Sequence, residues 1–243
     1  MIKGLYRSAS GMLPHVDKQE AIAHNIANAG AIGFKKNRVF AKELTDAEAR
    51  VRPKKSDWEK TVASYIKVDY SPGAFDKTTN PLDLAIEGDG FFTLQADDGS
   101  TVLTRSGSFV VDSEGFLAFP GGYRLIGDGG AIQVGTGQLS VSESGEVQVD
   151  GSSVGRITPK TVADVDRLVR LGGSLFGVPQ GETLLPPLSF TIQQGYLETS
   201  NVDVVQEMVD MIVSYRTYEA NAKALQTQDS SLDHLMSKVA GKR

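Results

Sequence analysis

Apolar residues recur at helical spacing at both ends of the chain, while the middle shows short runs separated by turns. Near the N-terminus the steps alternate between three and four, broken only by the polar Gln19. This N-terminal stripe consists of Ile2, Leu5, Ala9, Met12, Val16, Ala23 and Ile26. The period is that of a coiled-coil helix and predicts a helix over residues 1–28.

The C-terminal region repeats nearly the same period, with Glu219 and Gln226 as polar interruptions. This C-terminal stripe consists of Val205, Met208, Ile212, Tyr215, Ala222, Leu225, Leu232, Met236 and Val239. Two stripes of matching period, far apart in sequence, predict that the two terminal helices pack together.

The central residues have the pattern of successive β-hairpins, with short apolar runs bounded by Gly, Asp and Ser. Strands are expected at 84–86, 91–94, 102–105, 109–111, 116–119, 139–141, 146–149, 154–157 and 184–192. The predicted class is α+β, in which a predominantly antiparallel β domain is inserted between terminal helices that pack as a coiled-coil-like assembly domain. The expected segments are 1–35, an assembly helix; 36–79, a linker with an extended segment; 80–194, the β domain; and 195–243, a second assembly helix.

Three local features refine these boundaries. Residues 28–33 contain Asn28, Gly30 and Gly33, which are typical of a helix C-terminus. In the linker, residues 39–50 favour a short helix ended by Pro53, and residues 58–70 favour an extended strand. Pro14 lacks an amide donor, so the first helix should kink or begin there.

Composition narrows the class of protein. The chain has 243 residues, of which 40% are hydrophobic, and contains no run near the roughly 18 apolar residues of a membrane helix. No cleavable secretory signal is expected, which by itself favours the cytoplasm. The net charge of −5 argues against binding of nucleic acid. The absence of cysteine excludes disulfides and thiolate catalysis.

Candidate chemistry is sparse. The three histidines, His15, His24 and His234, fall on the predicted helices without metal-ligand spacing. Residues 88–93 lack the third glycine of a dinucleotide fingerprint, because Thr93 stands there. The carboxylates of the middle fall in predicted turns, although a glycosidase pair remains an open alternative. We expect no catalytic residue, no metal and no cofactor.

Three segments carry a resemblance to a known family. Residues 23–35, AHNIANAGAIGFK, resemble the N-terminal signature of bacterial flagellar rod and hook proteins, with His24 and Ala31 as departures. Residues 80–92, together with 104–109 and 112–115, resemble the family's central motif. Residues 195–203, followed by 207–209 and 216–221, resemble its C-terminal signature. The three occur in the family's order over nearly the whole chain.

The resemblance implies a structural subunit of the flagellar basal-body rod, the drive shaft that crosses the periplasm. Within the family, a proximal-rod member is favoured over a distal-rod or hook-type member. It replaces the cytoplasmic expectation with the basal body, reached through the flagellum's own export apparatus without a cleaved signal. The implied partners are other flagellar axial proteins and further copies of the chain in a helical assembly, with neither nucleic acid nor membrane insertion.

The expected assembly interface contains both stripes and the turn between them. It comprises Ile2, Leu5, Ala9, Met12, Val16, Ala23, Asn25, Ile26, Asn28, Phe34, Val205, Met208, Ile212, Tyr215, Ala222, Leu225, Leu232 and Met236. Phe34 is expected to pack on a helix of the same or an adjacent subunit. Two alternatives remain: a secreted carbohydrate-active enzyme with a carboxylate-lined cleft, and a soluble adaptor whose terminal helices form a closed intramolecular hairpin.

Overall fold

A computed structural model describes residues 2–43, 62–96 and 98–240, which form two compact units. Of these residues, the helical unit contains 2–27, 37–43, 62–69 and 203–240, and the β unit contains 28–36, 70–96 and 98–202. The β unit therefore contains the nine residues that follow the first helix, of which the sequence pattern had grouped 28–35 with that helix and 36 with the linker.

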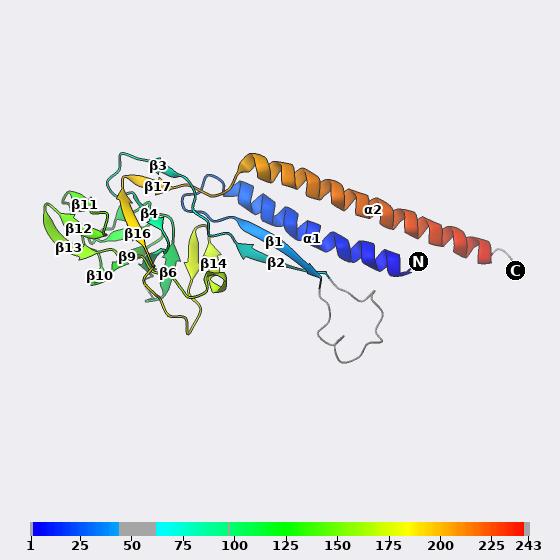
Figure 1. The fold of residues 1–243 in the computed structure, drawn as a ribbon, viewed down its shortest axis with the longest axis horizontal. Helices are drawn as coiled ribbons and strands as arrows, with labels where there is room; N and C mark the ends of the chain where they lie inside the picture. Colours follow the sequence, from blue (N-terminus) through cyan, green and yellow to red (C-terminus); the bar gives the residue numbers. More distant parts are fainter. Residues whose placement is uncertain (1, 44–61, 97, 241–243) are drawn as a thin grey trace. The chain divides into compact units, whose positions relative to one another are not determined.

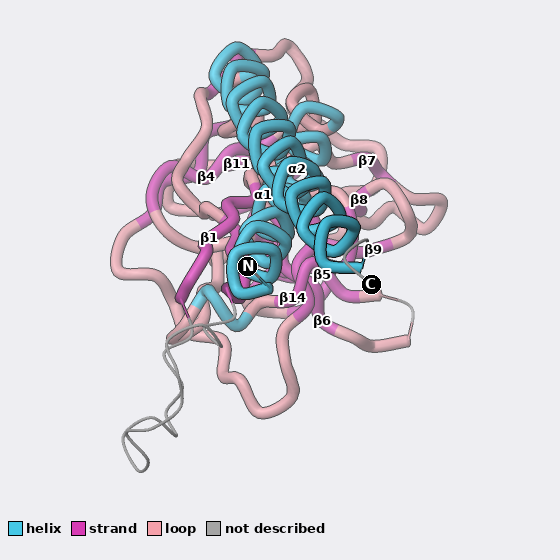
Figure 2. Tube along the Cα trace, turned by 90° about the vertical axis from the view of Figure 1, so that its right-hand side faces the viewer, coloured by secondary structure: helices cyan, strands magenta, loops and turns pink. Residues whose placement is uncertain are grey.

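The helical unit contains two antiparallel helices and a β-hairpin. Helix α1 (Ile2–Ala27) lies beside α2 (Val204–Ala240), and the hairpin of β1 (Asn37–Glu43) and β2 (Val62–Val68) packs on α1 (Figure 1). Figure 2 shows the two helices following each other along their lengths. The expectation of two terminal helices that pack together is confirmed.

The helix boundaries follow from local chemistry. Helix α1 begins at Ile2 and passes through Pro14, so the alternative of a start at Pro14 is wrong. At the other helix, the carboxylate of Asp203 accepts hydrogen bonds from the backbone N–H groups of Val205 and Gln206, at 3.0 and 3.1 Å. This N-cap satisfies donors that an α-helix leaves unpaired in its first turn.

Strand β1 corrects the short helix expected over residues 39–50. Residues 39–43 are extended and pair with β2 in a continuous register from Asn37 opposite Val68 to Glu43 opposite Val62. The rings of Phe40 and Tyr65 stack across this hairpin with centroids 5.6 Å apart. Such pairing outweighs weak helical propensity because it stabilises an extended backbone. Residues 44–61, which include the rest of that predicted helix, lie outside the described part; β2 confirms the strand expected within 58–70.

The β unit is a set of short antiparallel strands. They are β3 (Phe75–Lys77), β4 (Leu84–Gly88), β5 (Phe92–Gln95), β6 (Thr101–Thr104), β7 (Val110–Val111), β8 (Leu117–Phe119), β9 (Tyr123–Gly127), β10 (Gly130–Ala131), β11 (Leu139–Val141), β12 (Glu146–Val149), β13 (Ser152–Arg156), β14 (Val169–Gly172), β15 (Leu175–Gly177), β16 (Phe190–Gln194) and β17 (Tyr196–Glu198). The largest sheet has the order β14-β15-β6-β5-β9-β8-β7, with β10 on β9. Smaller sheets are β11-β12-β13, β16-β4 and β17-β3.

The core of the β unit is apolar and closely packed. Leu84 and Ile86 of β4 are almost fully buried with Phe92 of β5, whose ring meets Phe109 edge-on at 5.2 Å. Gly107 permits its backbone to lie close against β4, because a Cβ there would stand 1.5 Å from the carbonyl oxygen of Leu84. These residues belong to the central segments in which the sequence predicted hairpins.

One predicted strand is shorter and shifted. The sequence favoured extension over residues 184–192, but β16 covers only Phe190–Gln194 and pairs with β4. Pro186 and Pro187 have no backbone N–H to donate to a ladder, which accounts for the late start. Strand β9 has no counterpart among the predicted strands, because the glycines at 121 and 122 mark only the turn that precedes it.

Candidate assembly surface

Helices α1 and α2 meet through a stripe that mixes apolar and polar residues. The Oγ atom of Ser214, which is 2% exposed, donates to the carbonyl oxygen of His15 at 3.2 Å. Near the other end of the contact, Asn25 Nδ2 donates to Glu207 Oε2 at 3.2 Å. Residues of α2 with reduced exposure recur at steps of three and four: Val204, Glu207, Met211, Ser214, Tyr218, Asn221, Leu225 and Gln228. We name this set the contact stripe.

Most residues of the C-terminal stripe predicted from the sequence follow a residue of the contact stripe by one position in the chain. One residue corresponds to about 100° of rotation on an α-helix, so this surface is turned away from the contact. The most exposed members are Val205 at 73%, Ile212 at 55%, Tyr215 at 54% and Met208 at 51%. The two helices therefore pack together while these four apolar residues of the predicted stripe stay on the surface.

The N-terminal stripe is placed in the same way. Val16 is 37% exposed and Ala23 is exposed, while Met12 and Ile26 are half-buried. Among residues 12–27 of α1, whose side chains are described, the fully buried positions are instead Ala21, Ile22 and Asn25. On α2, Ala222 and Leu225 are half-buried. Ile2, Leu5, Ala9, Leu232 and Met236 lie within the two helices, and their side chains are outside the described part of the structure.

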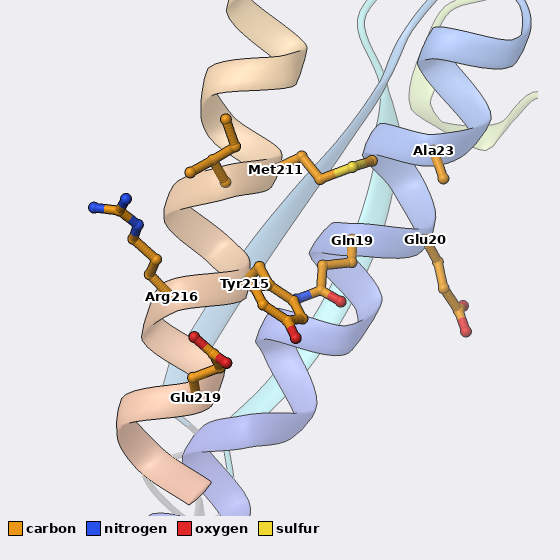
Figure 3. Close-up of a pocket in the computed structure, with 8 residues that line it drawn as sticks. Gln19, Glu20, Ala23, Met211, Tyr215, Arg216 and Glu219 are labelled. Carbon is orange, nitrogen blue, oxygen red and sulfur yellow. The ribbon is translucent and has the colours of Figure 1, made fainter. Parts of the chain in front are cut away.

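An open groove runs between the two helices where the stripes approach each other. Its volume is about 630 Å³. It is lined from α1 by Gln19, Glu20 and Ala23 and from α2 by Met211, Ile212, Tyr215, Arg216 and Glu219. Figure 3 shows Met211 and Tyr215 projecting from α2 towards α1, while Glu20 and Arg216 point away from the space between the helices. The groove thus has an apolar floor and charged flanks.

Asn25 holds the end of α1 to the start of the hairpin. It is 1% exposed, its Oδ1 accepts from the N–H of Asn37 at 2.8 Å, and its Nδ2 donates to the carbonyl oxygen of Asn37 at 2.9 Å. The side chain therefore satisfies both backbone groups of one strand residue, as a neighbouring strand would. In the single chain Asn25 offers no surface to a second subunit.

Residues 28–36 form a turn that belongs to the β unit. The carbonyl of Asn28 accepts from Ala31 N–H, and Gly33 N–H donates to the carbonyl of Glu198 at 2.7 Å. Gly33 has φ +64°, and a Cβ there would lie 2.3 Å from the backbone nitrogen of Ser106, so only glycine fits without a shift. The turn expected at this place is confirmed.

Phe34 belongs to the β unit and is fully buried. It has no exposed surface, and the guanidinium of Arg170 lies 4.7 Å from its ring centroid, a cation–π geometry. The ring therefore supports the interior of this unit, and it offers no surface to a neighbouring subunit.

A buried charged cluster, unforeseen in the sequence, follows Phe34. Lys35 Nζ lies 2.5 Å from Glu198 Oε1, and both side chains are fully buried. Arg105 Nη1 lies 3.5 Å from Glu198 Oε2 and also donates to the carbonyl of Ile86. Lys35 further donates to the carbonyl of Ser71 at 2.7 Å. Burial lowers the pKa of Arg105, and the nearby Glu198 opposes that shift.

The cluster unites three stretches distant in sequence. Lys35 belongs to the first motif, Arg105 to the central one and Glu198 to the last. The only feature of the sequence that could have predicted this cluster was the presence of opposite charges in three separate motifs. A single sequence gives no reason to pair these charges. Removal of one partner would leave a buried charge without compensation. The cluster therefore fixes the segments at the two ends of the β unit, which contain Lys35 and Glu198, in the interior of that unit.

Metal-binding clusters and membrane-spanning helices are both absent from the described residues. Among them, no group of three or more His, Asp or Glu side chains is arranged to hold a metal ion. Within that same part of the chain, no helix is long and apolar enough to span a bilayer.

Comparison with known proteins identifies the family. Residues 85–149 match the model of the flagellar hook protein FlgE/F/G D1 domain, and residues 193–237 match that of the flagellar basal body rod FlgEFG protein C-terminal region. The flagellar basal-body rod protein FlgG of Bacillus subtilis is 31% identical over 264 aligned residues, covering 97% of this chain and 98% of the relative. The chain belongs to the flagellar basal-body rod protein family.

Other members match over a similar extent. The FlgG protein of Borreliella burgdorferi is 31% identical and covers 96% of this chain and 97% of its own length. The FlgF protein of Rhizobium meliloti is 28% identical over the full length of both chains. The chain is a structural subunit of the bacterial flagellar basal-body rod and not an enzyme. The family resemblance predicted from the three sequence motifs is confirmed.

Proposed function

We propose that this rod subunit self-assembles through the apolar surfaces that α1 and α2 leave exposed, and that the two helices form a coiled-coil-like core with those of neighbouring subunits. The observation that carries the proposal is the exposure of Val205, Met208, Ile212 and Tyr215, each more than half accessible. A subunit of an axial structure needs such surfaces, because neighbouring subunits bind to them and bury their apolar side chains.

Full burial of a large apolar side chain stabilises by roughly 1.5–3 kcal/mol, so burial of the exposed halves of four such residues contributes about 3–6 kcal/mol per subunit before the cost of association. The period of the stripe suits the interdigitation of helices at a shallow angle, as in coiled coils. The gain recurs at every subunit and so favours a long assembly.

The wider role follows from the family. In the proposed arrangement the β unit is inserted between the assembly helices, and the assembled subunits cross the periplasm as part of the drive shaft, in contact with other flagellar axial proteins. Export proceeds through the flagellar export apparatus. A proximal place in the rod stays a prediction, since relatives named FlgG and FlgF both match nearly the whole chain.

The substitution Ile212→Asp tests the proposal. Because Ile212 is 55% exposed in the single chain, a carboxylate there stays hydrated and leaves the subunit folded. In an assembly the same carboxylate would be buried without a partner, so we expect the subunit to remain in the supernatant when the parent chain sediments. Ala224→Asp, which introduces the same carboxylate at another exposed position of α2, is the control and should sediment normally.

Two results would contradict the proposal. Normal sedimentation of the Ile212→Asp chain would remove this surface from the interface. A parent chain that stays monomeric at every concentration, with fully protected helices, would instead favour the closed hairpin of an adaptor.

A further inference from the structure

The groove between α1 and α2 combines an apolar floor with more acids than cations. Its floor is made by apolar residues of α2, among them Met211 and Tyr215. The charged residues that line it are Glu20 and Glu219, with Arg216 as the cation. A suitable occupant therefore has exposed apolar side chains flanked by an excess of positive charge.

The hairpin of β1 and β2 has one face that is turned away from α1. Side chains along a strand alternate between its two faces. The side chain of Asn37 lies on the α1 side, because its Nδ2 is 3.3 Å from Nδ1 of His24. The even-numbered positions of β1 therefore lie on the opposite face, which we name the outer face of the hairpin. In the hairpin register its residues form two cross-strand pairs, Arg38 with Lys67 and Phe40 with Tyr65.

The outer face is exposed, aromatic and cationic. Phe40 and Tyr65 are 41% and 43% exposed, and their stacked rings present a continuous apolar surface. The side chain of Arg38 is 61% exposed, and Lys67 is exposed beside the rings. The carboxylate of Asp69 lies 3.6 Å from the guanidinium of Arg38 and neutralises part of this charge. The face keeps a net positive charge, opposite to that of the groove.

We propose that the outer face of the β1–β2 hairpin of one subunit binds the α1–α2 groove of a second copy of this chain. The inference rests on the proposed function and names the element that covers the groove side of the exposed stripe. The rings of Phe40 and Tyr65 lie against the apolar floor, and the cations lie near Glu20 and Glu219. Helix α2 of a second copy is a poorer occupant, because it carries more acids than cations and would bring like charges together.

Within one subunit, the hairpin and the groove lie on different sides of α1. Asn25, whose side chain binds the backbone of Asn37, marks the hairpin side. Glu20 lines the groove and precedes Asn25 by five residues, which places the two about 140° apart around the helix. Because the outer face also points away from α1, it meets a groove only on another copy. Such a head-to-tail contact repeats without closing unless its rotation forms a ring, and an open repeat is a helical filament.

Cysteine cross-linking tests the contact, because the chain contains no cysteine. One full-length chain carries Tyr65→Cys on the outer face, and a second carries Ala23→Cys in the groove together with a mass tag. The two are mixed and oxidised under conditions in which the parent chain sediments. We expect a disulfide-linked heterodimer at roughly ten times the yield of the control mixtures, which corresponds to about 1.4 kcal/mol of preference. Lys67→Cys, which keeps both rings, serves as a second outer-face variant.

Matched controls move each cysteine to the other side of its element. Ile66→Cys places the cysteine one residue along β2, at a 54% exposed site on the opposite face of the hairpin. Ala224→Cys replaces the groove cysteine at an exposed site that follows Tyr215 by nine residues, about 180° around α2. The controls thus separate binding through the outer face and the groove from mere proximity of the subunits.

Each alternative result has a defined meaning. Sedimenting chains in which neither outer-face variant links above the controls would overturn the hairpin contact and leave the proposed function standing. Efficient cross-linking of Leu13→Cys, a 60% exposed site on α1, to Ala23→Cys, with none from either outer-face variant, would assign the groove to α1 of a second copy and overturn the proposal. Chains that remain monomeric throughout would overturn both this contact and the proposed function.

Discussion

At the scale of single residues, the buried charges of the β unit are the least expected feature. Lys35, Arg105 and Glu198 each occupy a site that most proteins fill with apolar side chains. Ion pairs in such sites are costly to desolvate. Their main effect on stability is the large destabilisation that follows when one partner is removed. Because the three come from three motifs, the penalty applies to the folding of the whole β unit.

Replacement of Lys35 by methionine should destabilise the β unit strongly. The change leaves the fully buried Glu198 without its nearest cation, and removal of one partner of a buried pair costs about 3–5 kcal/mol. Urea unfolding followed by the circular dichroism of the β-strands measures the loss. The double replacement of Lys35 by Met and Glu198 by Gln should cost less than the sum of the single changes.

Arg38→Met provides the matched control. Its guanidinium is 61% exposed and lies 3.6 Å from Asp69, and exposed pairs contribute about 0–1 kcal/mol. A loss of stability no larger for Lys35→Met than for Arg38→Met would show that the buried pair does not hold the unit together.

At the scale of elements, the connecting segments decide where the β unit begins and ends. Residues 28–36 belong to it, with Phe34 and Lys35 fully buried, and Glu198 is buried at its other end. The N–H of Lys36 donates to Asn201 Oδ1 at 2.8 Å, and Asn201 N–H donates to the carbonyl of Phe34. The two connections are therefore hydrogen-bonded to each other inside the unit.

A fragment of residues 28–202 should fold by itself, whereas a fragment of residues 36–194 should not. The shorter fragment lacks Phe34, Lys35 and Glu198, and so leaves Arg105 buried without its carboxylate. Dispersion of amide signals in a proton–nitrogen NMR spectrum distinguishes the two. A well-dispersed spectrum from the shorter fragment would contradict the assignment of the connections to the β unit.

Sequence patterns predicted the elements that depend on neighbours in the chain. The period of the terminal stripes gave both helices, and turn residues between apolar runs gave strands such as β4 and β5. Strand β1 was missed because its extended state depends on pairing with β2, which is not a local property of residues 39–43. The rotation of the contact stripe was also hidden, since the strongest apolar period follows residues that are exposed in the single chain, such as Val205 and Ile212, whereas the internal contact includes Ser214 and Glu207.

At the scale of the whole molecule, we propose that the exposed stripe of α2 is a surface in the free subunit and an interior in the rod. The intramolecular contact satisfies Ser214 and Asn25, but it leaves Val205, Met208 and Ile212 in water. Contiguous exposed apolar surface of this kind commonly marks a protein interaction site.

The most direct measurement is hydroxyl-radical footprinting of the parent chain, first as the free subunit and then after sedimentation. The account predicts that Met208, Ile212 and Tyr215, which are each more than half exposed in the free subunit, react readily there and several-fold less in the assembly. Phe34, which is fully buried, should stay protected in both states. Equal reactivity of Met208, Ile212 and Tyr215 before and after assembly would contradict the account.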